Sequence, residues 1–219
     1  MIKKILLGLV VALLALVGFI ASRPSTFTVQ RSITMKSEPE YIFPFVNSLY
    51  RWADWSPWND LDPAMKRTYE GPVLGVGSVY AWSGNDKVGE GRMTLEESRK
   101  DELVRIKLEF IKPFASTNTT TVTIKPLAER SSVVTWTMEG HNGFAGKAAS
   151  LFMNMDAMIG KDFEKGLAKL RDLAEAESDE EHEEEVLDNA VRKAMAETEK
   201  APAPAEGSPA PSQAPAPKQ

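Results

Sequence analysis

The segment from Arg51 to Pro63, RWADWSPWNDLDP, combines two kinds of side chain that could bind or transform a ligand. It holds three of the chain's five tryptophans and three carboxylates: Trp52, Trp55, Trp58, Asp54, Asp60 and Asp62. Paired carboxylates can act as acid and base, but aspartate near proline more often forms turns and caps. Trp52 and Trp55 share one helical face and are expected to pack inward. Trp58 follows Pro57 and either packs or contacts a ligand.

Other side chains that commonly do chemistry are scarce. The chain has no cysteine, which excludes disulfides, thiolate catalysis and thiolate metal sites. His141 lies in HNG, a turn composition with no metal-ligand spacing nearby, and His182 lies within the charge run EEHEEE. We therefore predict no catalytic residue, no metal and no cofactor.

The first 24 residues contain a long apolar segment. Lys3 and Lys4 precede an uncharged run from Ile5 to Ser22, which as a helix would cover roughly 27 Å, close to the thickness of a bilayer core. A cleavable signal peptide is the alternative, but cuts after Ala21 or Ser22 would place a large residue at the −3 position. We expect a retained single-pass anchor at residues 1–24 in an inner membrane. The two lysines favour a cytoplasmic N-terminus and a periplasmic C-terminal domain.

Charge is distributed unevenly along the chain. Residues 177–219 carry eleven acidic and four basic side chains, so the overall charge of −5 leaves residues 1–176 at +2. The body has no basic stripe, which argues against a nucleic-acid partner. The tail is acidic and then rich in proline and alanine, and it is expected to be disordered, apart from a thin apolar stripe that could extend a helix. It serves as a spacer or reaches an envelope protein partner.

The body, residues 25–176, reads as an α+β domain. A strand at 27–35 is followed by a capping box at Ser37 and Glu40 and by two short helices at 41–46 and 49–55. Strands with hairpin-length links then alternate to about residue 139, giving about seven strands in a mainly antiparallel sheet. Residues 146–177 form one amphipathic helix of about thirty residues. Between such a helix and a curved sheet we expect an apolar cavity.

Two strand patterns indicate which side chains face that cavity. If Ser83 pairs with Val88, Trp82 lies opposite Gly89 and Tyr80 opposite Gly91. That register places Tyr80, Trp82, Met93 and Leu95 on an apolar face, and Glu90, Arg92, Thr94 and Glu96 on a polar one. In the neighbouring strands Val104, Ile106, Leu108 and Phe110 share a face, as do Asn118, Thr120, Val122 and Ile124. Asn118 could therefore point inward and form a hydrogen bond with a ligand.

Three motifs in order resemble the START-like superfamily, also called SRPBCC or helix-grip, and within it the polyketide cyclase/dehydrase-type subfamily. They are W-x-x-W-x-P-W-x-x-x-D-P from Trp52, G-x-G-x-x-Y-x-W-x-G-N from Gly75, and G-x-G-x-M from Gly89, followed by the terminal run 162–170. The resemblance covers residues 27–174. It implies a curved antiparallel sheet around a long C-terminal helix, with the tryptophan segment across the cavity mouth.

The resemblance and the strand patterns together predict a function. We expect a membrane-anchored domain that binds a hydrophobic or amphipathic small molecule, such as a lipid, without catalysis. The expected cavity residues are Trp58, Tyr80, Trp82, Met93, Asn118, Trp136, Met155 and Met158. Two alternatives remain, because a fold does not determine chemistry. One is a polyketide cyclase/dehydratase-like enzyme, and the other is an envelope interaction module with a filled core.

Overall fold

The computed structural model describes residues 1–128, 130–151 and 154–199. Residues 1–179 form one compact unit and the residues from 180 onward a second. The first element is α1 (Ile2–Ala21), whose apolar side chains are almost all exposed. Among the described residues it is the one helix long and apolar enough to cross a membrane, and a signal sequence would meet the same criteria.

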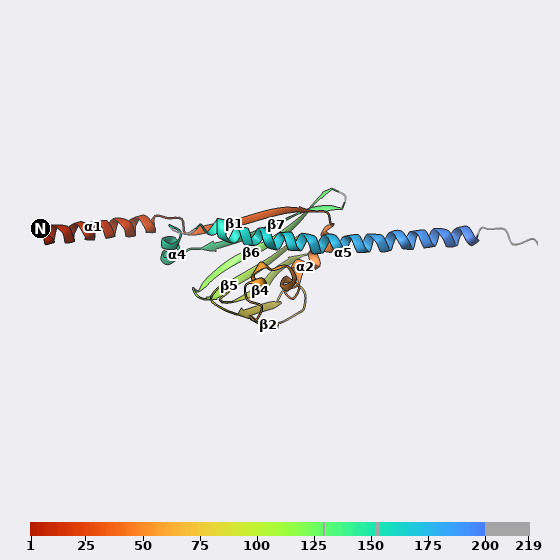
Figure 1. Ribbon diagram of the computed structural model, residues 1–219, viewed down its shortest axis with the longest axis horizontal. Coiled ribbons are helices and arrows are strands. Elements are labelled where there is room, and N and C mark those ends of the chain that lie inside the picture. Colours follow the sequence, from red (N-terminus) through yellow and green to blue (C-terminus); the bar gives the residue numbers. More distant parts are fainter. Residues whose placement is uncertain (129, 152–153, 200–219) are drawn as a thin grey trace, which may run out of the picture. The chain divides into compact units, whose positions relative to one another are not determined.

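Seven antiparallel strands form one sheet in the order β1-β7-β6-β5-β4-β3-β2 (Figure 1). Consecutive strands from β2 to β7 are neighbours, as short links require, and β1 closes the sheet beside β7. The predicted α+β class, strand number and pairing direction are confirmed. The strands are β1 (Thr26–Met35), β2 (Lys66–Glu70), β3 (Val79–Ser83), β4 (Glu90–Arg99), β5 (Leu103–Lys112), β6 (Ser116–Ala128) and β7 (Ser131–His141).

The short helices after β1 are α2 (Pro39–Asn47), α3 (Trp52–Trp55) and a 3₁₀ helix (Pro57–Asp60). The predicted capping box is wrong. The residue before the first turn of α2 is Glu38, and no side chain caps that turn. Ser37 is buried, and its carbonyl accepts a hydrogen bond from the Ser132 hydroxyl of β7 at 2.8 Å. Ser37 therefore joins α2 to the sheet rather than capping it.

The predicted single terminal helix is two helices, α4 (Phe144–Ala149) and α5 (Met155–Glu199). The side chain of Asn154 explains the second start, because its Oδ1 accepts the backbone N–H of Ala157 at 3.0 Å, which is an N-cap contact. Within the first unit, α5 buries Phe163, Leu167, Leu170 and Ala174 against the sheet at helical spacing.

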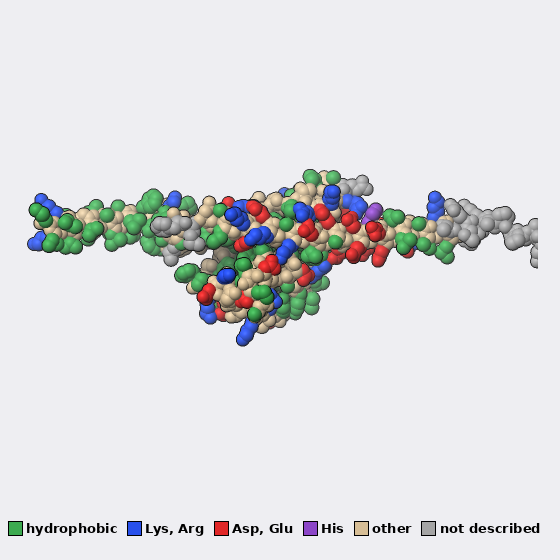
Figure 2. All heavy atoms as spheres, viewed as in Figure 1, with side chains coloured by type: hydrophobic (Ala, Val, Ile, Leu, Met, Phe, Trp, Pro, Cys, Tyr) green, Lys and Arg blue, Asp and Glu red, His purple; other side chains and the backbone are tan. Residues whose placement is uncertain are grey.

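Past residue 179, α5 is described as part of the second unit. Its carboxylates gather around His182 (Figure 2). The thin apolar stripe predicted there is exposed at Val186, Leu187 and Val191. The prediction of a disordered proline- and alanine-rich end concerns residues 200–219, which lie outside the described residues.

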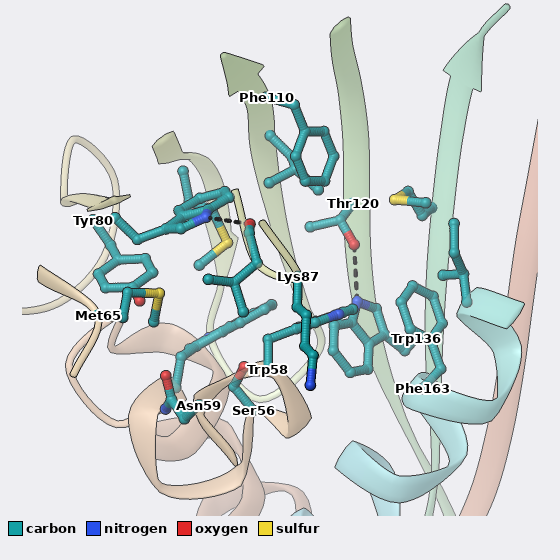
Figure 3. A pocket seen from close by; sticks show the side chains of 17 residues that line it. Ser56, Trp58, Asn59, Met65, Tyr80, Lys87, Phe110, Thr120, Trp136 and Phe163 are labelled. Atoms are coloured by element: carbon teal, nitrogen blue, oxygen red, sulfur yellow. Dashed lines mark hydrogen bonds between the residues drawn. The ribbon is translucent and has the colours of Figure 1, made fainter. Parts of the chain in front are cut away.

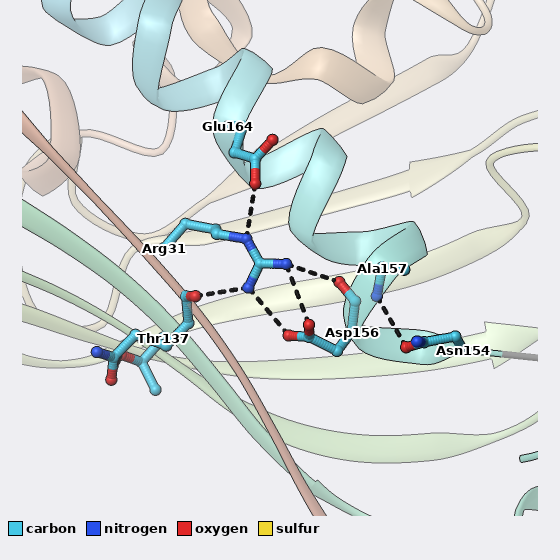
Figure 4. A network of polar contacts seen from close by, with 7 residues as sticks. Arg31, Thr137, Asn154, Asp156, Ala157 and Glu164 are labelled. Carbon is cyan, nitrogen blue, oxygen red and sulfur yellow. Dashed lines mark hydrogen bonds and ion pairs between the residues drawn. The ribbon is translucent and has the colours of Figure 1, made fainter.

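Arg31 of β1 fixes the start of α5 to the sheet (Figure 4). Its Nε donates to Glu164 Oε1 at 2.8 Å, and its Nη1 and Nη2 donate to the Asp156 carboxylate at 2.9 and 3.2 Å. Gly160 faces the guanidinium, where a Cβ would overlap it. The hydrogen bond from Arg31 holds the pKa of Asp156 below its ordinary value, while Asp156 and then Glu164 raise the pKa of Arg31.

A low pH is expected to weaken the attachment of α5 to β1 through Arg31 and Asp156. Because the pKa of Asp156 is lower in the folded state, its contribution to stability is complete above the ordinary carboxyl pKa of about 4 and is lost as pH falls through the folded value. Thermal melts of the wild type and of Asp156→Asn should therefore differ at pH 7 and converge as the pH is lowered below the ordinary carboxyl pKa. A difference that stays constant with pH would contradict this assignment.

The β3–β4 hairpin has the predicted faces but a different register. Trp82 pairs with Gly91 and Ser83 with Glu90, two residues beyond the predicted partners. Gly89, the predicted partner of Trp82, instead has φ +65° and closes the loop, where its N–H donates to Asn85 O at 2.8 Å. The Trp82 indole lies over Gly91, where a Cβ would overlap it. A shift of two residues preserves the faces, so Met93 and Leu95 remain buried.

Candidate functional site

An apolar cavity of about 180 Å³ lies between the sheet and α5 (Figure 3). Alternate residues of β3 to β7 form its sheet wall, because side chains two apart in a strand face the same side. The 3₁₀ segment and α5 form the opposite wall. The lining residues are Trp52, Ser56, Trp58, Asn59, Met65, Tyr80, Trp82, Lys87, Val88, Met93, Leu108, Phe110, Thr120, Trp136, Met138, Ile159 and Phe163.

A cluster of aromatic rings around Trp136 forms the base of the cavity. Trp136 is 2% exposed and stacks on Phe163 of α5 at 4.1 Å between ring centroids and 2° between planes. Its indole N–H donates to Thr120 Oγ1 at 2.8 Å (Figure 3). Trp58 packs edge-on against Trp136 at 5.8 Å. This cluster joins β7, α5 and the 3₁₀ helix.

The three tryptophans of residues 51–63 lie in two different environments, as their spacing predicts. Trp52 and Trp55 are buried, and their indole N–H groups donate to the backbone carbonyls of Val46 and Phe45 at 2.9 and 3.2 Å. Trp58 is half-buried and contributes to the cavity wall. The inward packing of Trp52 and Trp55 is confirmed. Trp52 also touches the cavity from the core, and Trp58 is the more exposed of the two tryptophans of this segment that line it.

Two of the three aspartates of the same segment form polar contacts outside the cavity. Asp62 accepts the backbone N–H of Asn85 at 2.7 Å and that of Ala64 at 3.2 Å, and Asp60 pairs with Lys169 at 2.6 Å. Asp62 therefore stabilises turns and Asp60 binds α5, and none of the three aspartates lines the cavity.

Few polar groups face the cavity. Tyr80 is half-buried, and burial raises the pKa of its phenol above the ordinary value, so the hydroxyl is neutral at physiological pH. Ser56, Asn59, Lys87 and Thr120 also line the cavity and are labelled in Figure 3. Among the described lining residues there is no carboxylate and no histidine. The rest of the lining is mainly aromatic and aliphatic, which is typical of a pocket for an apolar ligand.

A second cavity, of about 190 Å³, lies between the sheet and the start of α5. It shares Phe110, Met138 and Ile159 with the first cavity, and its lining mixes polar and apolar groups. Its remaining lining residues are Phe27, Ser116, Asn118, His141, Asn142 and Met155.

The eight side chains predicted for the cavity separate into three groups. Five line the first cavity: Trp58, Tyr80, Trp82, Met93 and Trp136. Asn118 and Met155 line the second. Met158 lines neither cavity and is 49% exposed, because the inner face of α5 runs through Met155, Ile159 and Phe163, four residues apart, and Met158 lies off that line.

Several lining residues were absent from the predicted set although their patterns marked them. Leu108 and Phe110 share the face of Val104 and Ile106, and Met138 is two residues beyond Trp136. Ile159 and Phe163 belong to the apolar side of the predicted helix. Met65, Lys87 and Val88 lie in or beside loops, where no periodic signal exists.

The sheet, the long helix against it and the cavity between them define a START-like, or helix-grip, domain. A model of the polyketide cyclase/dehydrase and lipid transport family matches residues 26–175. The chain belongs to this family, which confirms the resemblance inferred from the motifs. No curated protein matched the sequence.

Two solved structures illustrate the fold. A norcoclaurine synthase point mutant from Thalictrum flavum, in complex with a transition-state analogue, is 13% identical with a TM-score of 0.51, and the match covers 70% of this chain and 97% of that one. A hypothetical protein from Helicobacter pylori is 10% identical with a TM-score of 0.51, over 68% of this chain and 88% of that one. At these identities the likeness concerns the fold alone.

Proposed function

We propose that this protein binds a small hydrophobic or amphipathic molecule, such as a lipid, and holds it without chemical change at a membrane surface. The observation that carries the proposal is the apolar cavity of about 180 Å³ between the sheet and α5. Its side chains are mainly aromatic and aliphatic, which suits removal of a hydrocarbon surface from water. The lipid transport function in the family's description is consistent with this class of ligand.

The size of the cavity limits what it holds. Pockets for drug-sized ligands have volumes of about 300–1,000 Å³, whereas an apolar cavity of about 150 Å³ is large enough for benzene. A cavity of about 180 Å³ therefore suits one ring or a length of single acyl chain. A two-chain phospholipid would need much more space. We infer a ligand with one chain or a compact ring system.

Three of the tryptophans that line the cavity provide an internal probe. Trp58, Trp82 and Trp136 touch the space directly, so an entering ligand should change tryptophan emission. Native mass spectrometry of the full chain, released from membranes, should reveal a co-purifying small molecule, and adding that molecule should change the emission saturably. A chain that carries no ligand and shows no saturable change with single-chain amphiphiles would refute the proposal.

The anchor is part of the proposed function, because α1 would keep the domain where an amphipathic ligand is found. Full-length protein is expected to stay in the membrane pellet after an alkaline carbonate wash, and a chain lacking residues 1–24 should be released into the supernatant. An N-terminus beginning near residue 23 on the purified full-length product would instead identify a cleaved signal sequence. The cytoplasmic N-terminus and periplasmic domain are proposed on the two lysines alone.

A further inference from the structure

The side-chain oxygen of Asn118 is buried without a hydrogen-bond partner among the described residues. The residue is 6% exposed, and its Oδ1 is enclosed. The side chain lines the second cavity. Buried polar side chains in folded proteins are nearly always paired, so an amide oxygen without a donor beside a cavity calls for a partner from outside the chain.

The sheet makes room for this amide. Asn118 of β6 pairs with Gly140 of β7, which in turn pairs with Phe27 of β1. A Cβ at position 140 would overlap both the amide oxygen of Asn118 and the ring of Phe27. The glycine thus allows an asparagine to lie in the interior beside an aromatic ring.

The polar side chains near Asn118 are hydroxyl, amide and imidazole groups. Ser116, His141 and Asn142 line the same cavity, and no carboxylate, lysine or arginine lines it among the described residues. An amide offers both a donor and an acceptor, and a half-turn about its last bond exchanges them. The site therefore matches a neutral group that forms hydrogen bonds, such as a hydroxyl or an amide, better than it matches an ion.

The two cavities lie on either side of the same three side chains. Phe110, Met138 and Ile159 line both, and Met138 is an unbranched, flexible side chain. Methionine adapts its shape at small energetic cost, so a chain can pass where Met138 now lies. One elongated molecule can then occupy the first, apolar cavity and the second cavity, here called the polar cavity, at once.

The polar cavity lies at the end of the sheet that is tied to the N-terminal helix. Phe27, a lining residue, is six residues after Ala21, the last residue of α1. Six extended residues span at most about 22 Å. If α1 spans a bilayer, the polar cavity must lie within that distance of the end of the membrane helix.

We propose that the second cavity is the site for the polar end of a single-chain amphiphile, with Asn118 as the hydrogen-bonding residue. The inference rests on the proposed function and gives it a ligand class, a single hydrocarbon chain with an uncharged hydrogen-bonding end. The chain passes Met138 into the first cavity, and the polar end remains beside Asn118. This arrangement suits uptake from a membrane with the chain entering first.

The test compares two probes that differ only at one end. The full chain in phosphatidylcholine nanodiscs is titrated with 1-decanol and with 1-chlorodecane, and tryptophan emission is recorded. The wild type should bind 1-decanol about tenfold more tightly, because only the alcohol can pair with the amide. Asn118→Leu replaces the amide by an apolar side chain of nearly equal shape, and it should remove this preference. The affinity of the variant for 1-chlorodecane should stay within about twofold of the wild-type affinity for the same probe.

The stability of Asn118→Leu is the second readout. The variant should melt at the same temperature as the wild type or higher, because it removes an unpaired polar group. A clear drop in melting temperature would mean that the amide has a partner within the chain, and would overturn the proposal. Equal binding of the two probes by the wild type would overturn the polar site and leave the proposed function standing. Binding of neither would refute both.

Discussion

Trp136→Ala is expected to lower the free energy of unfolding by about 3–5 kcal/mol, a large part of the roughly 5–15 kcal/mol available to a domain. The indole is 2% exposed, stacks on Phe163 and packs against Trp52, Trp55 and Trp58. Its removal would leave a void next to the existing cavity and would release α5 from β7. Urea unfolding followed by circular dichroism measures the change.

Two variants make this prediction specific. Trp136→Phe keeps a ring but loses the hydrogen bond to Thr120, and it should cost about 1–3 kcal/mol. Trp58→Ala removes a half-buried indole from the edge of the cluster and should cost less than Trp136→Ala. An equal loss for Trp58→Ala and Trp136→Ala would show that the cluster has no central member.

Leu108→Trp is expected to weaken ligand binding by roughly fifteenfold with little loss of stability. Leu108 is half-buried on β5 and lines the first cavity, so a larger side chain would extend into space that a ligand otherwise occupies. Loss of room for about two methylene groups costs about 1.6 kcal/mol of transfer free energy, which corresponds to that ratio. Titration with 1-decanol, followed by tryptophan emission, gives the affinity.

The matched control lies three residues further along the same strand. Ile111 is 51% exposed and lines neither cavity, so Ile111→Trp introduces the same indole without filling any space. It should bind 1-decanol as the wild type does. If Leu108→Trp also binds normally while it melts normally, the ligand does not occupy the first cavity and the proposed function fails.

The strand faces could be predicted because alternation is a local property. Leu108 and Phe110 point to the same side as Val104 and Ile106 whatever the rest of the chain does. The register of the β3–β4 hairpin could not be derived in this way. A shift of two residues leaves every side chain on its face, so the pattern does not distinguish Gly89 from Gly91 as the partner of Trp82. The left-handed conformation of Gly89 decides between them.

The residue at which the terminal helix begins also could not be predicted from the sequence pattern. The apolar stripe from Leu151 to Leu170 reads as continuous, yet α5 begins only at Met155. Asn154 was the available signal, since asparagine is a preferred N-cap, but the same residue occurs inside helices. The different fates of Met155 and Met158 follow from which turn of α5 faces the sheet. Helical periodicity alone assigns both to a broad apolar face.

The sequence by itself determined the apolar N-terminal helix, the alternation of the strands, the broad apolar side of the terminal helix and the family, because each is encoded in nearby residues or in ordered motifs. Only the tertiary structure decided that Trp136 is the centre of the aromatic cluster, that two cavities lie in the interior and that the side-chain oxygen of Asn118 has no donor among the described residues. Those properties depend on contacts between strands and helices far apart in the chain. Burial and hydrogen bonding are sums over such contacts, and no local pattern contains them.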